Sequence, residues 1–148
     1  MITIQEAKAE DFAWINRQYE RIGFVPSAPA TDLVLIADYL GERAGIGRLV
    51  KMDPFLYELG GIYTLEWYRG LKVADSVVAA LVHRFRAIKA EHLYCIPFEK
   101  LCPFYSKHGF QKVDDTSDVP SKILEKLDWC LREYADPVSL MRLERIAR

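Results

Sequence analysis

Cysteines are few in this sequence, and their number is odd. Cys95, Cys102 and Cys130 are widely spaced along 148 residues. This pattern excludes the disulfide framework that holds small secreted domains together, so we expect reduced thiols. Neither the cysteines nor the three histidines show metal-ligand spacing, and no cysteine has a histidine at a recognisable catalytic spacing. We therefore expect no metal site and no cysteine nucleophile.

An excess of positive charge is also absent, because the formal net charge is −1. General nucleic-acid binders and proteins of anionic membrane surfaces usually carry a basic excess. No apolar run approaches the length of a membrane span, and residues 1–6 lack the charged and apolar blocks of a signal peptide. We expect a cytoplasmic protein with no nucleic-acid partner and no membrane partner.

Low-complexity segments, internal repeats and a convincing linker are missing as well. With 51% hydrophobic and 28% charged residues in 148 residues, the composition is that of a folded globular protein. The sequence therefore predicts one domain that spans residues 1–148 and is large enough to bury a core.

The hydrophobic pattern predicts a mixed α/β order of elements. Apolar residues recur with the period of a strand or of a helix, and two closely spaced prolines make 24–30 a loop. We expect strands over 2–4, 33–39, 46–52, 56–65, 91–96, 110–113 and 138–143, with a turn over 41–45, and helices over 8–22, 74–88, 99–107 and 121–134. An antiparallel beginning followed by strand–helix–strand repeats predicts a mixed sheet. The pair Gly60 and Gly61 indicates a bulge or a close approach to the backbone.

A basic loop precedes the central helix. Arg69, Gly70 and Lys72 stand where unpaired helix N–H groups and the helix dipole both favour an anion. A phosphate could bind at this turn. A basic loop without a ligand explains the same residues equally well.

Two motifs in this context carry a resemblance to a known family. The first is Glu66-Trp67-Tyr68-Arg69-Gly70-Leu71-Lys72-Val73-Ala74, in which an acidic residue, an aromatic residue and Arg-Gly lead into the helix. The second is Phe104-Tyr105-Ser106-Lys107-His108-Gly109-Phe110. Together with the order of elements, they make the chain similar to the GNAT family of acetyl-CoA-dependent N-acetyltransferases. Lys72 replaces the usual middle glycine of the first motif.

The resemblance implies a GNAT-like fold with a mixed, mostly antiparallel central sheet flanked by helices. It implies transfer of the acetyl group of acetyl-CoA to a primary amine, by direct attack through a tetrahedral intermediate. Backbone amides of the loop would bind the cofactor pyrophosphate, and those near Ile62 and Tyr63 would polarise the thioester carbonyl. The implied cofactor-binding residues are Ile62, Tyr63, Thr64, Arg69, Gly70, Leu71, Lys72, Val73, Ala74 and Asp75.

Acyl transfer to an amine requires a base, stabilisation of an oxyanion and a proton for the leaving thiolate. Glu58 lies just before the glycine pair, where the family often keeps a carboxylate, and it is the predicted general base. A solvated strand residue is the other interpretation of Glu58, and Glu66 is the second candidate base. Tyr105 matches the tyrosine that protonates the coenzyme A sulfur in many relatives, which we favour over a core tyrosine.

The amine acceptor is a small molecule or a peptide that the sequence does not identify. The segment 24–31 is a proposed lid, and the strand that begins at Val138 could support a homodimer as an edge or as an exchanged element. The alternative function is a non-catalytic acyl-CoA-binding sensor or a protein-interaction module on the same fold. Lys72, and Asp75 in place of a small or hydroxyl residue, favour this alternative.

Overall fold

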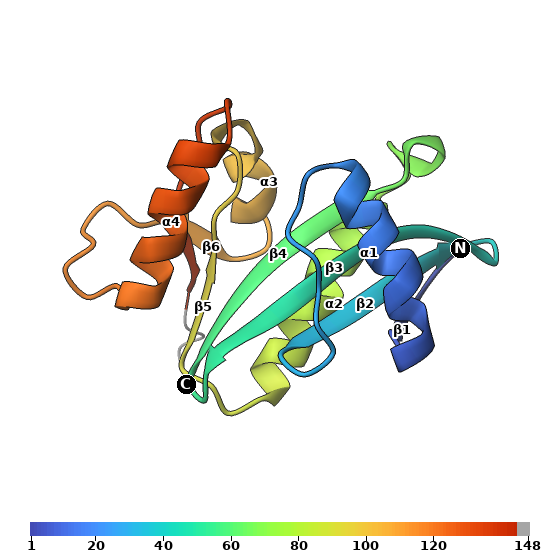
Figure 1. Ribbon diagram of the computed structural model, residues 1–148, viewed down its shortest axis with the longest axis horizontal. Helices are drawn as coiled ribbons and strands as arrows, with labels where there is room; N and C mark the ends of the chain where they lie inside the picture. Colours follow the sequence, from blue (N-terminus) through green and yellow to red (C-terminus); the bar gives the residue numbers. More distant parts are fainter. Residues whose placement is uncertain (145–148) are drawn as a thin grey trace. The chain divides into compact units, whose positions relative to one another are not determined.

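The computed structural model describes residues 1–144, and Figure 1 shows its helices and strands. The helices are α1 (Phe12–Arg21), α2 (Val73–Ala87), α3 (Cys102–Ser106) and α4 (Ser121–Glu133). The strands are β1 (Ile2–Glu6), β2 (Asp32–Tyr39), β3 (Glu42–Asp53), β4 (Leu56–Thr64), β5 (His92–Cys95), β6 (Phe110–Lys112) and β7 (Met141–Leu143). Short 3₁₀ turns η1 (Ala9–Asp11), η2 (Glu66–Tyr68) and η3 (Glu99–Leu101) precede α1, α2 and α3.

The strands follow the order β1-β2-β3-β4-β5-β7-β6, with antiparallel pairing at β1–β2, β2–β3, β5–β7 and β6–β7. The prediction of a mixed α/β fold with a mostly antiparallel sheet and flanking helices is thus confirmed. The chain forms two compact units: unit 1 comprises Met1–Lys51 and Leu59–Lys89, and unit 2 comprises Met52–Glu58 and the chain from Ala90 onward. The prediction of one domain over residues 1–148 stays a prediction.

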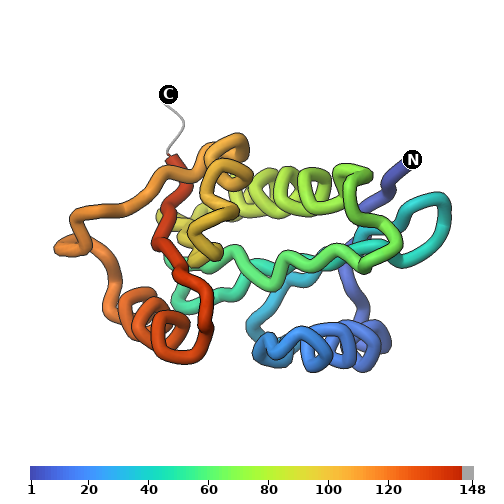
Figure 2. Tube along the Cα trace, turned by 90° about the horizontal axis from the view of Figure 1, so that it is seen from above, coloured from blue at the N-terminus to red at the C-terminus, as the bar shows by residue number. Residues whose placement is uncertain are grey.

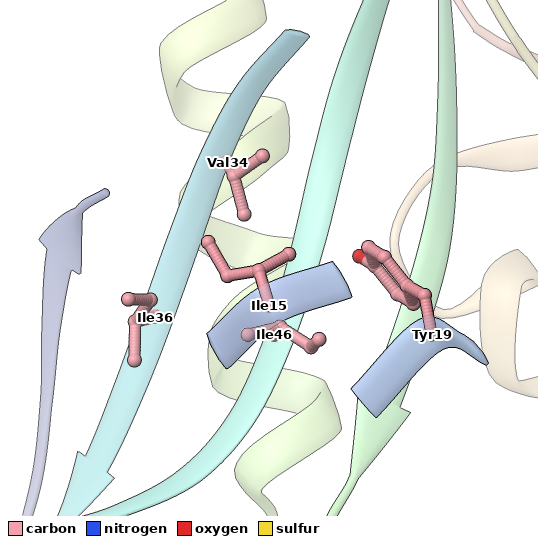
Figure 3. Packing of buried hydrophobic residues seen from close by; sticks show 5 residues of the cluster. All are labelled: Ile15, Tyr19, Val34, Ile36 and Ile46. Carbon is pink, nitrogen blue, oxygen red and sulfur yellow. The ribbon is translucent and has the colours of Figure 1, made fainter. Parts of the chain in front are cut away.

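One face of unit 1 is covered by α1. Alternate residues of β2 and one residue of β3 point toward this helix, and Figure 3 shows the buried cluster that they form with two of its side chains. The cluster consists of Ile15, Tyr19, Val34, Ile36 and Ile46. Full burial of an aliphatic or aromatic side chain is worth about 1.5–3 kcal/mol, so this cluster is a main source of the stability of unit 1.

The other face of the unit 1 strands is covered by α2, as Figure 2 shows. Two glycines of β3 allow the helix to lie close to the strand. A Cβ added at Gly45 would come within 2.6 Å of Val73 Cγ1, and one added at Gly47 would come within 2.6 Å of Val77 Cγ1. Since real Cβ atoms do not approach so closely, any side chain at these positions would displace α2.

The β2–β3 hairpin differs from the prediction at its turn. Leu40 and Gly41 form the turn, with φ of 50° and 86°, and β3 already begins at Glu42. The prediction of a turn over residues 41–45 was therefore wrong beyond Gly41. Gly45 belongs to a buried strand under α2, so its glycine is required by packing and not by a turn.

Unit 2 is organised around β5, β7 and β6. Tyr94 on β5 and Ile123 on α4 are both fully buried and belong to one apolar cluster with Leu56, Val119 and Leu140. β7 pairs with β5 on one side and with β6 on the other. The expectation that the last strand could be an edge is therefore wrong, and the homodimer stays a prediction.

No helix within residues 1–144 combines the length and the apolar character needed to span a membrane.

Candidate functional site

The predicted phosphate loop folds into a turn with two left-handed residues. Gly70 has φ of 81° and Lys72, the residue before α2, has φ of 65°. Only glycine enters this region without a steric penalty, so Lys72 is held in a strained conformation. The lysine that replaces the family's middle glycine thus adopts a conformation that favours glycine.

This turn encloses a pocket of about 230 Å³ at the N-terminus of α2. Its lining residues are Thr64, Tyr68, Arg69, Gly70, Lys72, Val73, Ala74 and Asp75. The first N–H groups of a helix lack intrahelical partners, and together with the helix dipole they favour an anion. The pocket therefore combines helix amides with the cationic side chains of Arg69 and Lys72.

The side chain of Arg69 also closes the loop, because its Nε donates a hydrogen bond of 3.3 Å to the carbonyl oxygen of Thr64. Behind the turn, the hydroxyl of Ser76 donates to the carbonyl oxygen of Lys72 at 3.1 Å. These two bonds tie the loop to the end of β4 and to the first turn of α2.

Three predicted cofactor-binding residues do not line this pocket. Ile62 and Tyr63 lie on β4 and are half-buried, whereas Leu71 is exposed on the loop. Ile62 is held by its own packing, since a Cβ added at Gly47 would meet Ile62 Cδ1 at 2.6 Å.

Glu58, the predicted base, is buried in unit 2 and only 4% exposed. Its carboxylate forms an ion pair with the ammonium of Lys126 on α4. The interpretation of Glu58 as a solvated strand residue was therefore wrong. The site thus places a carboxylate, buried and paired with a cation, at the position that the sequence assigned to the base.

The second candidate base, Glu66, lies on the short turn η2 and is exposed. It is in unit 1, whereas Glu58 is in unit 2. Its surroundings give it no feature that distinguishes it from a solvated surface carboxylate.

Tyr105, the predicted acid, is buried on α3 and only 7% exposed. Its ring meets Phe104 edge-on at a centroid distance of 5.0 Å and Phe110 at 6.1 Å. Burial raises the pKa of the Tyr105 phenol, and the nearby thiols of Cys95 and Cys102 raise it further. The hydroxyl therefore keeps its proton at neutral pH, and the raised pKa makes it a weaker acid than an exposed tyrosine.

The three cysteines of unit 2 are buried. Burial raises the pKa of the Cys95 and Cys130 thiols; the charge of Glu58 raises that of Cys95 further, whereas Lys126 partly opposes the rise at Cys130. Thiolates and not thiols are nucleophiles, so these side chains behave as small apolar groups. Within residues 1–144, no group of three or more His, Cys, Asp and Glu side chains is placed to hold a metal ion.

One polar contact was not anticipated from the sequence. The hydroxyl of Tyr19 on α1 donates a hydrogen bond of 2.7 Å to the carbonyl oxygen of Gly61 on β4. The guanidinium of Arg48 on β3 lies over the Tyr19 ring, with Cζ 4.4 Å from the centroid. A lone arginine inside the apolar run of β3 was the only available signal. The glycine pair did predict a close approach to this backbone, which is confirmed.

A second pocket of about 380 Å³ lies within unit 2. It is lined by Glu91, His92, Gln111, Lys112, Val113, Asp118, Arg142, Leu143 and Glu144. None of the predicted site residues lines it, and its charges are of both signs.

The model of the acetyltransferase (GNAT) family matches residues 3–110. No curated protein sequence matches the chain.

Several solved structures share the fold at low sequence identity. Rv2747 from Mycobacterium tuberculosis, solved in complex with CoA, has a TM-score of 0.76 at 15% identity over 97% of this chain and 99% of that chain. A GNAT family acetyltransferase from Elizabethkingia anophelis with acetyl-CoA bound has a TM-score of 0.68 at 16% identity, over 97% and 98% of the two chains.

N-acetylglutamate synthase from Neisseria gonorrhoeae, complexed with coenzyme A and N-acetyl-glutamate, has a TM-score of 0.70 at 15% identity. That match covers 98% of this chain but only 36% of the synthase. Because the family model covers most of the sequence, the chain belongs to the acetyltransferase (GNAT) family and is an acetyl-CoA-dependent N-acetyltransferase.

Proposed function

We propose that this acetyl-CoA-dependent N-acetyltransferase acetylates the primary amine of a small molecule by direct attack of the amine on the thioester. The observation that carries the proposal is the pocket at the start of α2, in which Gly70 and Lys72 are both left-handed. A loop of this conformation turns successive amide groups toward one anion, as phosphate-binding loops do.

Acetyl-CoA, when bound, supplies an acetyl group activated as a thioester. The amides at the start of α2 and the cations of Arg69 and Lys72 would hold its pyrophosphate. Asp75 lines the same pocket and would oppose the bound charge. Affinity for the donor therefore depends on whether two cations outweigh one carboxylate.

The amides of Ile62 and Tyr63 on β4 are the proposed donors to the thioester carbonyl oxygen. Acyl transfer places negative charge on this oxygen in the transition state. A fixed backbone N–H that bonds the charged oxygen more strongly than the neutral one lowers the barrier.

Glu58 is the proposed general base, acting directly or through water on the incoming ammonium. Its ion pair with Lys126 fixes the position of the carboxylate. Tyr105 is the proposed acid, because it occupies the position of the family's tyrosine; burial raises the pKa of its phenol and so makes the proton harder to give up. It would donate this proton to the departing thiolate.

An amino acid is the first acceptor class to test. N-acetylglutamate synthase from Neisseria gonorrhoeae was solved with N-acetyl-glutamate in one structure and with L-arginine in another. A peptide amine is the other class that the fold can serve, so an acceptor panel needs both.

The test begins with the melting temperature of the purified protein with acetyl-CoA, free CoA and ATP. A ligand at about a hundred times its dissociation constant adds about 2.7 kcal/mol of stability. We expect acetyl-CoA and CoA to raise the melting temperature and ATP to leave it unchanged.

Turnover is then measured as CoA release with amino acids, polyamines and peptides. Acetylation of an amino acid or a polyamine supports the proposal, whereas acetylation of peptides alone would refute the small-molecule acceptor. Binding of acetyl-CoA without transfer to any amine would instead indicate the non-catalytic sensor, and no binding would refute the donor pocket itself.

A further inference from the structure

The side chain of Tyr19 reaches from α1 to the backbone of β4. Tyr19 is fully buried, and Figure 3 shows its ring above the strands of unit 1, beside the aliphatic cluster of Ile15 and Ile46. Its hydroxyl donates to the Gly61 carbonyl oxygen at 2.7 Å across 42 positions of sequence. A buried hydroxyl needs a hydrogen-bond acceptor. Here the acceptor lies on β4, the strand whose Ile62 and Tyr63 amides are the proposed donors to the thioester oxygen.

Gly61 is enclosed by two side chains. Its φ is 60°, and a Cβ added there would lie 2.5 Å from Tyr19 Oη and 2.8 Å from Arg48 Nε. Two features therefore require glycine at position 61: the left-handed backbone, and the side chains of Tyr19 and Arg48 that occupy the space a Cβ would need. The peptide after Gly61 is closely surrounded on the α1 side of β4.

The Tyr19 ring is itself fixed by Arg48. The guanidinium of Arg48 lies 4.4 Å from the ring centroid and is buried. Asp32 lies 3.8 Å from this guanidinium, and its carboxylate also accepts from the Ser27 hydroxyl and the Ala28 amide. Buried charges that are paired and hydrogen-bonded have few alternative positions, so the ring has little room to tilt.

The Gly61 carbonyl and the Ile62 N–H belong to one planar trans peptide group. A hydrogen bond that fixes the carbonyl therefore also fixes the direction of this N–H, which points away from the Tyr19 hydroxyl. The same bond polarises the peptide and makes its N–H a stronger donor. On its other side, the Ile62 side chain packs beside Gly47 on β3.

We propose that Tyr19 is a positioning residue for acyl transfer: it orients and polarises the Gly61–Ile62 peptide so that the Ile62 N–H bonds the thioester oxygen. This inference rests on the proposed function and adds a residue of α1 to the machinery. Tyr19 acts through the backbone and does not touch the reacting atoms.

The decisive variant is Tyr19→Phe, which removes the hydroxyl and keeps the ring. Loss of a whole oxyanion donor costs about 10²- to 10³-fold in kcat, and this variant leaves the donor in place but unfixed. We therefore expect kcat to fall about tenfold, while the Kd of acetyl-CoA changes less than about twofold because the pyrophosphate pocket is untouched.

Tyr94→Phe is the matched control. Tyr94 is also fully buried, and its hydroxyl accepts a hydrogen bond of 3.3 Å from Arg142, but this contact lies in unit 2. The control loses a comparable buried contact and should keep both kcat and the Kd of acetyl-CoA. Melting temperatures of both variants show that each remains folded.

A spectroscopic readout tests the same contact without catalysis. The amide resonance of Ile62 should move in Tyr19→Phe and stay in place in Tyr94→Phe, because only the first variant removes the bond on the Gly61 carbonyl.

Unchanged kcat in Tyr19→Phe overturns the inference, and so does a parallel loss of kcat and of acetyl-CoA affinity, which would indicate general disruption. Wild-type protein without turnover refutes the proposed function instead, and the Ile62 resonance then decides alone whether Tyr19 orients this peptide.

Discussion

Replacing Lys72 by glycine should make the protein more stable and its donor binding weaker. Lys72 has φ of 65°, and a non-glycine residue in this region costs about 1–2 kcal/mol. Glycine removes this strain, but it also gives the unfolded chain more conformational freedom, which lowers the free energy of unfolding by about 0.4–1 kcal/mol. The expected net gain in the free energy of unfolding is about 0.5–1 kcal/mol, or about 1–4 °C in melting temperature for a chain of this size.

The same substitution removes an ammonium from the pocket. An exposed ion pair is worth up to about 1 kcal/mol, so the Kd of acetyl-CoA should rise about fivefold at low salt. Screening at high ionic strength should shrink the difference between wild-type protein and variant. Isothermal titration at two salt concentrations measures this effect.

Two further variants separate strain from charge. Lys72→Ala loses the ammonium but keeps a Cβ in the left-handed region, so affinity should fall as in Lys72→Gly without the gain in stability. Leu40→Gly is the converse, because Leu40 has φ of 50° in the β2–β3 turn and does not line the pocket. It should gain stability and keep the affinity for acetyl-CoA.

Equal melting temperatures for Lys72→Gly and Lys72→Ala would refute the strain argument. Equal affinities for wild-type protein and both Lys72 variants, at low salt, would show that the ammonium does not meet the pyrophosphate.

Four other outcomes follow from the structure. Tyr105→Phe should lower kcat with little change in the Kd of acetyl-CoA, and an unchanged rate in a stopped-flow assay would remove Tyr105 from the mechanism. Glu58→Gln should lower kcat about 10²-fold or more, whereas an unchanged kcat would mean that the carboxylate only pairs with Lys126. Gly47→Ala should lower the free energy of unfolding, measured in urea, by about 1–3 kcal/mol, because the added Cβ would come within 3.0 Å of Val77 Cγ1 and Leu81 Cδ1. An unchanged urea midpoint would mean that α2 can move away freely. Burial raises the pKa of the Tyr105 phenol above its usual 10.0, so the folded protein holds this proton more tightly than the unfolded chain does. The contribution of this phenol to the free energy of unfolding should therefore be constant below about pH 10 and fall as the pH rises further. Tyr105→Phe should flatten this alkaline fall, and an identical alkaline curve would contradict the argument.

Most of the fold could be predicted from the sequence because its signals are local. The apolar period of β1, α2 and α4 and the prolines of the loop after α1 need no knowledge of distant residues. The β2–β3 turn was misplaced because Gly45 suits a turn and a close helix contact equally well. Only the position of Val73 on α2 decides between them.

The candidate site could be predicted in part, for the same reason. The loop residues and Tyr105 follow from motifs that are contiguous in sequence. The burial of Glu58 could not be predicted, since it depends on Lys126, which is 68 positions away. The bond from Tyr19 to Gly61 joins a helix to a strand across 42 positions and has no local pattern.

The placement of β7 between β5 and β6 sets an order for folding during synthesis. All elements of unit 1, from β1 to α2, have been synthesised once the chain reaches residue 89. In unit 2, however, β5 and β6 are made first and have no strand between them until residues 141–143 follow. A released chain that ends between residues 112 and 141 exposes both of these strand edges, and such edges attract other chains. We therefore expect such a truncated chain to aggregate more readily than the complete protein.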